Sequence, residues 1–325
     1  MKDQYGREIN YMRISITDRC NLRCRYCMPH GIKKVPMERI LTYEQITEIC
    51  EAAAGLGITC FRITGGEPLV RLACTDLVRD IRNIPGVKNV TLTTNGILLP
   101  DLCEALTDAG LAGVNISLDT LDREKYAMIT GFDLLHKTLE GIDAALRCGL
   151  RTKVNAVLQR GVNDDGWHDL ILLAKDRPVD VRFIELMPIG DAQTAESVSN
   201  DELYAKIRAT YPDASDDDSV HGNGPAKYIH IPGFSGSVGF ISAMHGKFCS
   251  SCNRIRLTSK GLLKTCLCYS DSTDLMPVFN ENDRGRRRDL LTDTIARSIA
   301  GKQREHHFEN TGDITEMKKM FEIGG

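Results

Sequence analysis

The fold is decided by the stretch Arg13-Ile-Ser-Ile-Thr-Asp-Arg-Cys20-Asn-Leu-Arg-Cys24-Arg-Tyr-Cys27. It begins with a β-rich run and continues into a loop with three cysteines spaced Cys-x3-Cys-x2-Cys. Three thiolates on a four-iron cube leave one iron open for a substrate to chelate, whereas protein-only clusters normally use four cysteines. A structural zinc site would need a fourth ligand, for which His30 is a candidate. Both interpretations place a metal centre directly after the first strand.

Short β-rich runs and amphipathic segments alternate from this stretch to about residue 210. Strands are predicted over residues 12–16, 60–64, 90–93, 113–118, 152–158 and 181–186. Thr42-Tyr-Glu-Gln45 is a capping box that predicts the start of the first helix, and Gly110 and Gly149 predict the ends of two later helices. Six β-then-α units predict a parallel sheet with right-handed crossovers. Six units are too few for a complete (β/α)8 barrel but suit an open, partial one.

The pattern changes after about residue 212. Residues 214–224 are acidic and contain glycine, which predicts a loop, and residues up to 263 read as short strands and turns. A helix is predicted near residues 289–299, followed by a polar tail that ends in Gly324-Gly325. We therefore expect two regions, a partial barrel over residues 1–212 and a C-terminal region over residues 213–325.

Composition places the chain among ordinary globular proteins. The chain has 325 residues, of which 42% are apolar and 26% charged, and its formal net charge is -3. This balance gives no electrostatic reason to expect a nucleic-acid or membrane partner. No apolar run approaches the ~20 residues of a membrane span, and the first residues lack the apolar stretch of a secretory signal. We expect a cytoplasmic protein.

The twelve cysteines predict metal ligands rather than disulfides, because the chain is long and has no export signal. Six of them form two groups, one near each end of the chain. The first group is Cys20, Cys24 and Cys27, and the second is Cys249, Cys252 and Cys266. The cysteines expected to be small buried hydrophobic residues are Cys50, Cys60, Cys74, Cys103 and Cys148. Cys268 is ambiguous.

Polar residues gather where the predicted strands end. These segments are Gly65-Gly-Glu-Pro68, Thr94-Asn-Gly96, Ser117-Leu-Asp119, Lys153-Val-Asn155 and Arg182-Phe-Ile-Glu185. Any one of them could be a turn or a helix cap. Together they predict a ligand site, because parallel strands deliver their carboxyl ends to the same edge of a sheet.

The second cysteine group has two interpretations. Cys249, Cys252, Cys266 and Cys268 could form a closed zinc knuckle, although a Cys-x-Cys pair is tight for one ion. Alternatively, three of them hold a second cluster with an open iron. Arg254 and Arg256 favour the open site, because alternation on a strand would point both to one face, where they could grip an anionic substrate.

These segments resemble the molybdenum cofactor biosynthesis protein A family, the GTP 3′,8-cyclases of the radical S-adenosylmethionine (SAM) superfamily. The resemblance covers nearly the whole chain. Besides the opening stretch and the strand ends, it includes Arg62-Ile-Thr-Gly-Gly-Glu-Pro68, Thr93-Thr-Asn-Gly96, Phe248-Cys-Ser-Ser-Cys-Asn-Arg-Ile-Arg-Leu257 and the final Gly324-Gly325.

The resemblance implies an incomplete (β/α)6 TIM-type barrel with a C-terminal extension, two 4Fe–4S clusters and SAM as cofactor. It further implies that a 5′-deoxyadenosyl radical takes the ribose 3′ hydrogen of GTP and that the substrate radical attacks C8 of guanine. Reduction then yields 3′,8-cyclo-7,8-dihydro-GTP. The implied partners are an electron donor and cyclic pyranopterin monophosphate synthase, with the chain a monomer or homodimer.

The resemblance also assigns residue roles. Cys20, Cys24 and Cys27 would bind the SAM cluster, and Cys249, Cys252 and Cys266 the substrate cluster. Tyr26, Gly66, Ser117 and Met187 would contact SAM, and the Gly65-Gly66 backbone would leave room for the methionine amino group. The implied GTP contacts are Arg13, Arg62, Thr93, Lys153, Arg254 and Arg256. The catalytic group would comprise Arg13, Arg182 and the tail glycines Gly324 and Gly325.

Two positions depart from the family pattern. Cys60 stands where the family often has a lysine, and Cys268 stands where phenylalanine commonly follows the second-cluster Cys-Leu. Two alternative functions remain open at this point. One is a radical SAM enzyme with an auxiliary cluster that modifies a peptide, and the other is a non-catalytic zinc module.

Overall fold

The computed structural model describes residues 1–31, 36–193 and 195–324. Six β/α units form its first part, as predicted. The strands are β1 (Tyr11–Ser15), β2 (Cys60–Thr64), β3 (Asn89–Thr94), β4 (Gly113–Ser117), β5 (Arg151–Ala156) and β6 (Val179–Ile184). The helices are α1 (Tyr43–Gly55), α2 (Cys74–Asn83), α3 (Leu99–Asp108), α4 (Arg123–Thr130), α5 (Leu135–Arg147), α6 (Trp167–Asp176) and α7 (Asn200–Thr210).

The residues predicted to start or end helices lie at helix ends in the structure. The Thr42 hydroxyl accepts a hydrogen bond from the backbone N–H of Gln45, and the backbone N–H of Thr42 donates to the side-chain oxygen of Gln45, so the capping box starts α1. Gly110 and Gly149 follow α3 and α5 with φ of 87° and 70°, a left-handed conformation that glycine adopts without steric cost.

The region after residue 212 contributes the remaining elements. They are β7 (Ser215–Asp217), β8 (Lys227–His230), β9 (Val238–Ile241), β10 (Arg254–Leu257), β11 (Leu262–Lys264), β12 (Thr273–Asp274) and α8 (Arg284–Ala300). Two expectations need correction. The predicted loop over 214–224 contains β7, which pairs with β8. The helix predicted near 289–299 begins earlier, because Asp283 caps it through a hydrogen bond from the backbone of Arg286.

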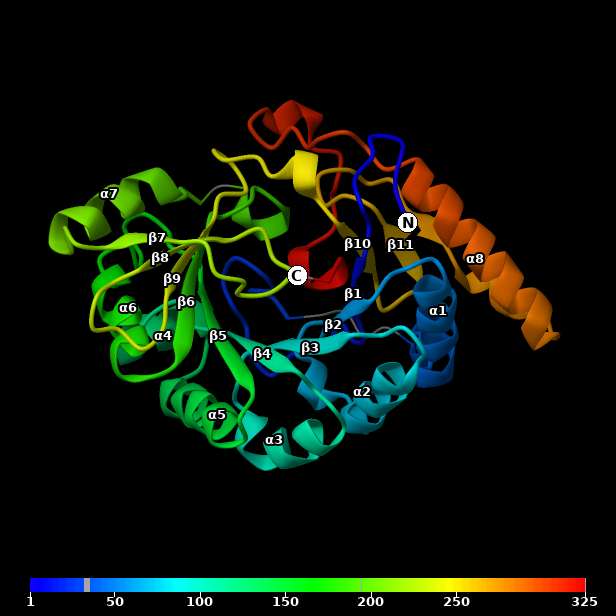
Figure 1. The fold of residues 1–325 in the computed structure, drawn as a ribbon, viewed down its shortest axis with the longest axis horizontal. Coiled ribbons are helices and arrows are strands. Elements are labelled where there is room, and N and C mark those ends of the chain that lie inside the picture. The colour runs from blue at the N-terminus through cyan, green and yellow to red at the C-terminus, as the bar shows by residue number, and fades with distance from the viewer. Residues whose placement is uncertain (32–35, 194, 325) are drawn as a thin grey trace.

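All described strands join one sheet in the order β12-β11-β10-β1-β2-β3-β4-β5-β6-β9-β8-β7. The run from β10 to β9 is parallel throughout, and the outermost strands at both edges are antiparallel. The sheet curves into an open arc with α1, α2, α3, α5 and α6 on its outer side (Figure 1). This is a mixed α/β fold with a large parallel sheet, consistent with the expected partial barrel. The region boundary near residue 212 stays a prediction.

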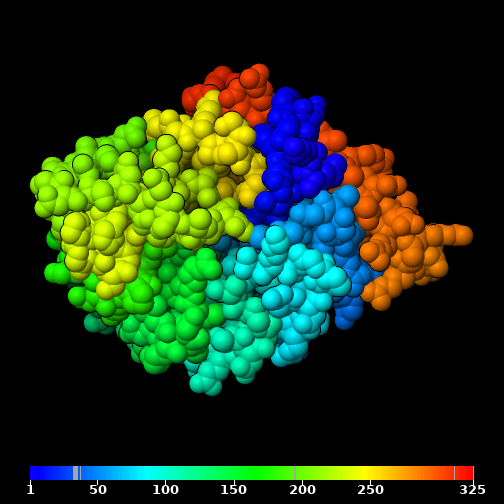
Figure 2. All heavy atoms as spheres, in the orientation of Figure 1, coloured from blue at the N-terminus to red at the C-terminus, as the bar shows by residue number. Residues whose placement is uncertain are grey.

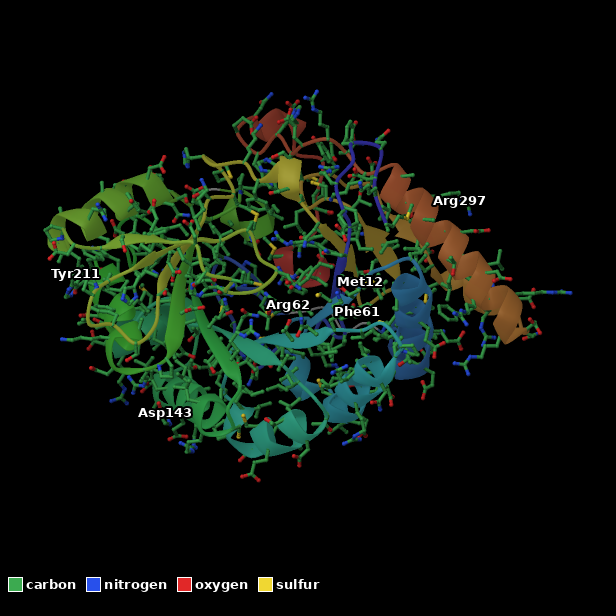
Figure 3. All side chains as sticks on the ribbon, in the orientation of Figure 1. Met12, Phe61, Arg62, Asp143, Tyr211 and Arg297 are labelled. Carbon is green, nitrogen blue, oxygen red and sulfur yellow. The ribbon has the colours of Figure 1, made fainter. Side chains whose placement is uncertain are left out.

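Alternation along the strands separates the core from the site. Ile14, Ile63 and Val154 belong to the large apolar core that the helices cover. The residues directly before or after them, Arg13, Arg62 and Asn155, line the inner cavity. Figure 3 shows Arg62 inside the arc, while Asp143, Tyr211 and Arg297 lie at its periphery. Among the described helices, none is long and apolar enough to cross a lipid bilayer.

Candidate active site

The loop with the first cysteine triplet is held against the end of β2. Gly66 donates its backbone N–H to the carbonyl of Thr17 at 2.8 Å, and Glu67 donates to the carbonyl of Arg19 at the same distance. A Cβ atom on Gly66 would lie 2.4 Å from the carbonyl oxygen of Arg19. Position 66 therefore requires glycine because the loop approaches so closely. The sequence had suggested room for SAM as the reason, and the loop supplies an additional one.

Glu67 completes this junction from a fully buried position. Its carboxylate accepts hydrogen bonds from Thr94 Oγ1 at 2.7 Å, Asn95 N at 2.7 Å and Leu69 N at 3.1 Å. Burial raises the pKa of Glu67 to about 7, although these donors oppose the shift. The carboxylate thereby ties the end of β2 to the end of β3, beneath the first cysteine loop.

Cys20, Cys24 and Cys27 all line one large cavity inside the arc. Burial raises the pKa of Cys24 well above its ordinary value, and repulsion from Cys27, Asp119 and Cys20 adds to the effect. Burial also raises the pKa of Cys27 to about 12, although the backbone N–H of Phe321 donates a hydrogen bond to it. Thiols in this setting become thiolates only when a cation compensates their charge. The donor set therefore fits an iron–sulfur cluster.

Tyr26 is fixed by a buried carboxylate on the opposite wall. Its hydroxyl donates to Asp119 Oδ2 at 2.7 Å, and the backbone N–H of Val157 donates to Asp119 Oδ1 at 2.9 Å. Burial raises the pKa of Asp119 to about 6. Ser117 and Met187, the other residues expected near SAM, line the same cavity.

The second triplet faces the first across this cavity. Cys249, Cys252 and Cys266 line it together with Cys20, Cys24 and Cys27. Burial alone would raise the pKa of Cys252, but the positive charges of Lys302, Arg254 and Arg256 lower it overall. Three thiols beside buried cations again fit an anionic iron–sulfur cluster.

Cys268 lies apart from this triplet. It is fully buried in a small apolar cluster with Ile189, Leu267, Phe308 and Ile323, and it does not line the cavity. Within the described part of the chain, no three His, Cys, Asp or Glu side chains lie close enough to ligate one metal ion.

Three arginines form a row across adjacent strands. Arg13 on β1 is in register with Arg256 on β10 and with Arg62 on β2. Arg254 lies two residues before Arg256. The guanidinium of Arg254 is 6.0 Å from the ring centroid of Tyr11, and the guanidinium of Arg62 is 5.5 Å from the same centroid. Burial and mutual repulsion lower the pKa of Arg13 strongly and that of Arg256 to about 10. Such a concentration of buried positive charge is suited to a polyanion.

Arg182 occupies the opposite wall of the cavity. Its Nε and Nη2 donate to Asn155 Oδ1 at 2.9 and 2.6 Å, and Nη2 also donates to Asn115 Oδ1 at 2.5 Å. Asn115 was not predicted as a site residue. Its place on β4, two residues before Ser117 and so on the same face, was the available signal.

Lys153 departs from its expected position. Its ammonium lies 3.0 Å from Asp180 Oδ2 and 3.0 Å from the Tyr228 hydroxyl, and it also donates to the carbonyl of His221. Lys153 is not among the lining residues, whereas Thr93, the other expected contact on this side, is. Burial and repulsion from Arg182 lower the pKa of Lys153 to about 8, and Asp180 partly offsets this.

Cys60 stands at a position where the family often has lysine, and its thiol contacts a loop from the C-terminal region. The amide of Asn223 donates to Cys60 Sγ, which brings the loop after β7 into the interior. The next two residues of that loop, Gly224 and Pro225, line the cavity. A loop predicted only as a connection thus contributes to the wall of the site.

The C-terminal tail enters the arc, and the C-terminus lies at its centre (Figure 1). Arg256 Nη1 donates to the carbonyl of Gly324 at 3.1 Å, and Gly324 has φ of 80°. Lys319 forms an ion pair with Asp191 at 2.8 Å. Gly325, the other predicted tail residue, lies outside the described residues.

Two residues of this site were missed by sequence reasoning. Lys302 and His306 line the cavity, although they follow α8 in a stretch with no recognisable motif. No local signal could have found them, because their place depends on contacts with distant segments.

Comparison with known proteins agrees with this geometry. The radical SAM superfamily model matches residues 14–174, and the model described as Molybdenum Cofactor Synthesis C matches residues 179–308. Curated proteins named GTP 3′,8-cyclase are 45% identical in Alkaliphilus oremlandii, 42% in Clostridium perfringens strain 13 and 44% in Moorella thermoacetica. Each alignment covers 100% of both chains.

Solved structures share the fold at much lower identity. SuiB from Streptococcus suis, solved with S-adenosylmethionine bound, has a TM-score of 0.63 at 13% identity, covering 97% of this chain and 78% of that one. Methylornithine synthase has a TM-score of 0.51 at 18% identity, covering 64% of each chain.

Proposed function

Because the chain belongs to the GTP 3′,8-cyclase family of radical SAM enzymes, we propose that its cavity converts GTP into (8S)-3′,8-cyclo-7,8-dihydroguanosine 5′-triphosphate. This is the first step of molybdenum cofactor biosynthesis. The observation that carries the proposal is a group of half-buried arginines that line the same cavity as the two cysteine triplets, namely Arg13, Arg62, Arg254 and Arg256. A nucleotide triphosphate offers the negative charge that such a group needs.

The two triplets would hold the metal centres. We assign Cys20, Cys24 and Cys27 to the cluster that binds SAM, and Cys249, Cys252 and Cys266 to the cluster that faces the substrate. With SAM bound, the first centre supplies the 5′-deoxyadenosyl radical that takes the ribose 3′ hydrogen.

The chain itself would bind and orient the reactants. Tyr26, held by Asp119, would contact SAM together with Gly66, Ser117 and Met187. The arginines would bind the triphosphate through charge-assisted hydrogen bonds, and its negative charge would offset their mutual repulsion. Arg182, braced by two asparagines, would lie near the reacting ribose.

Enclosure is the other contribution of the chain. Met320 and Phe321 of the tail line the cavity, Gly324 accepts a hydrogen bond from Arg256, and Gly224 and Pro225 add to the lining. A site closed in this way would keep water and oxidants from the radicals. Thr93 and Lys153 are proposed as further GTP contacts, the latter after release from Asp180.

The setting of the enzyme is also a proposal. We propose a cytoplasmic protein, monomeric or homodimeric, that takes electrons from a reducing partner. Its product would pass to cyclic pyranopterin monophosphate synthase. Neither nucleic acid nor a membrane is proposed as a partner, since the formal net charge is only -3.

The deciding experiment is an anaerobic assay of the reconstituted protein with SAM, GTP and a reductant. We expect 5′-deoxyadenosine and a cyclised dihydro-nucleotide in equal amounts. Cleavage of SAM with GTP unchanged would contradict the proposal and favour a radical SAM enzyme that modifies a peptide. Zinc without acid-labile sulfide in anaerobically purified protein would contradict it at an earlier stage.

A further inference from the structure

The three cysteines of the second triplet come from segments that are not held together by the sheet alone. Cys249 begins a short 3-10 turn, Cys252 precedes β10, and Cys266 follows β11. A cluster needs all three thiols in position at once. Two buried cations from distant parts of the chain, Arg7 and Lys302, bind the backbone of these segments.

Arg7 is oriented by a tight turn near the N-terminus. Asp3 Oδ2 accepts from Arg7 Nε at 2.6 Å, and Asp3 Oδ1 accepts from the backbone N–H groups of Tyr5 and Arg7 at 2.9 and 3.0 Å. Both side chains of the ion pair are buried. This leaves the rest of the guanidinium free to reach other segments in a fixed direction.

The two Nη groups of Arg7 donate hydrogen bonds to two separate segments of the chain. Nη1 donates to the carbonyl of Cys249 at 2.9 Å and to that of Arg304 at 2.6 Å, and Nη2 donates to the carbonyl of Gln303 at 2.6 Å. Figure 2 shows the N-terminal residues at the surface between the segment around residue 250 and the segment around residue 300. One side chain therefore connects the first cysteine of the triplet to the stretch after α8.

Lys302 makes the matching connection to the other two cysteines. Its ammonium donates to the carbonyl of Arg254, two residues after Cys252, at 3.0 Å. It also donates to the carbonyl of Thr265, the residue directly before Cys266. Lys302 is 2% exposed and lines the cavity. It is thus both a brace between two strands and a buried positive charge beside the triplet.

We propose that Arg7 and Lys302 form a two-cation clamp that fixes Cys249, Cys252 and Cys266 in ligating positions, which makes them positioning residues for the second cluster. The clamp acts through backbone carbonyls. The inference rests on the proposed function only in that the second triplet holds a cluster.

The clamp predicts a selective loss of one metal centre. In Lys302→Met the carbonyls of Arg254 and Thr265 lose their donor while the length of the side chain is kept. In Arg7→Lys the charge remains, but the fork that joins Cys249 to Gln303 and Arg304 is lost. We expect iron and sulfide to fall from about eight to about four per chain in each variant, the content of one remaining cluster. Lys302→Arg, which keeps charge and donors, should retain part of the second cluster.

A matched control is available two residues before Cys249. Lys247 pairs with Glu309 at the surface, so Lys247→Met removes a lysine charge near the same cysteine without touching the clamp. This variant should keep both clusters, because exposed ion pairs contribute little. Circular dichroism of each variant would report on folding, and Asp3→Asn provides a milder disturbance of Arg7 should Arg7→Lys fail to fold.

The readouts are iron and sulfide content, electron paramagnetic resonance of the reduced protein, and SAM cleavage without GTP. The proposal requires loss of the second-cluster signal while the first-cluster signal and SAM cleavage persist. Full loading of Lys302→Met and Arg7→Lys would overturn it, and so would equal loss of both clusters. A wild-type chain that holds only one cluster would contradict the proposed function itself. Failure of the proposed function is thereby distinguished from failure of the clamp, which is seen only in the variants.

Discussion

Arg256, which lines the cavity, donates from Nη1 to the carbonyl of the buried Gly324 at 3.1 Å. The arginine comes from a strand at one end of the parallel run, and the glycine from the tail. The contact brings the last described residue of the chain to the row Arg256, Arg13 and Arg62. The tail is therefore part of the wall that encloses the positive charges.

Gly324→Ala tests this contact. Gly324 has φ of 80°, and an added Cβ would lie 3.4 Å from Cβ of Ser15. The left-handed conformation costs alanine about 1–2 kcal/mol, so we expect the tail to leave its place. GTP cyclisation should fall about tenfold, while SAM cleavage without GTP continues.

Gly233→Ala is the matched control. Gly233 has φ of 84°, and nothing lies within 4 Å of the position its Cβ would take. Alanine at position 233 imposes similar backbone strain at a residue that does not line the cavity, so this variant should leave turnover unchanged. Equal activity of both variants would show that the tail contact has no role in turnover.

Cys266 and Cys268 form a natural pair for mutation. Cys266 lines the cavity and Cys268 lies in an apolar cluster, although one residue separates them. Cys266→Ser should abolish cyclisation and remove the second cluster. Cys268→Ser should keep both, with a lower melting temperature because it buries a hydroxyl, at a cost of about 1–3 kcal/mol. Iron analysis and the anaerobic assay check both outcomes, and a loss of iron in Cys268→Ser equal to that in Cys266→Ser would restore the four-cysteine site.

Lys153 predicts a pH dependence of GTP binding. Burial lowers its pKa from 10.5 to about 8, so its positive charge is lost as the pH rises through 8. If the charge contributes a phosphate contact, the dissociation constant of GTP should rise by about tenfold above that pH. In the unfolded chain Lys153 keeps its proton up to about pH 10.5, whereas in the folded protein it loses the proton near pH 8. The unfolded state therefore binds more protons between these values, so the free energy of unfolding rises with pH there. Weaker binding therefore cannot be attributed to unfolding caused by this group.

Lys153→Arg separates this effect from other titrations. Arginine stays protonated across the range, so its dissociation constant should be flatter with pH than that of the wild type. Calorimetry of GTP binding to the anaerobic holoenzyme, from pH 7 to 9.5, provides the comparison. Parallel pH profiles in the two proteins would exclude Lys153 as the titrating contact.

Tyr26→Phe tests the brace on the SAM side. The variant removes the hydroxyl that donates to the carboxylate of Asp119 at 2.7 Å. Losing a buried hydrogen bond to a carboxyl group should cost about 1–3 kcal/mol of stability and weaken SAM binding several-fold. Iron content should not change, because the cysteines are untouched.

Tyr204→Phe is the surface counterpart of that change. Its hydroxyl lies 3.5 Å from Asp216 Oδ1 at an exposed position. Melting temperature and SAM affinity should both equal those of the wild type. A shift of the same size in the two variants would mean that the Tyr26–Asp119 bond has no special role.

Much of the fold was readable from local patterns. The six predicted strands match β1 to β6 with ends that differ by at most two residues, and the capping box at Thr42 starts α1 as expected. These signals are local, since they depend on residues within one or two turns of chain. The region after residue 212 was harder to predict. There β7 has only three residues, and β9 and β10 add parallel strands to the two edges of the six-strand run.

The functional site likewise has a part that was predictable from the sequence and a part that was not. Residue types and spacing predicted both cysteine triplets with Arg254 and Arg256, and the family resemblance added Arg13 and Arg62. The structure brings these groups to one cavity. The pairing of Lys153 with Asp180 and the approach of Asn223 to Cys60 were not predictable, because each joins strands or loops far apart in the chain. The predicted ligand roles themselves await the measurements above.

The sequence by itself determined the chemistry, namely two triplets of thiols, a set of cations and a run of β/α units that carries them. Only the tertiary structure decided which groups meet. It joins Arg7 to Cys249 across 242 residues and Lys302 to Thr265 across 37, and it places Cys268 in the core although Cys266 faces the cavity. The physical reason is that a buried cation must find its acceptors wherever the fold brings carbonyl groups together, and a linear pattern does not encode that meeting point.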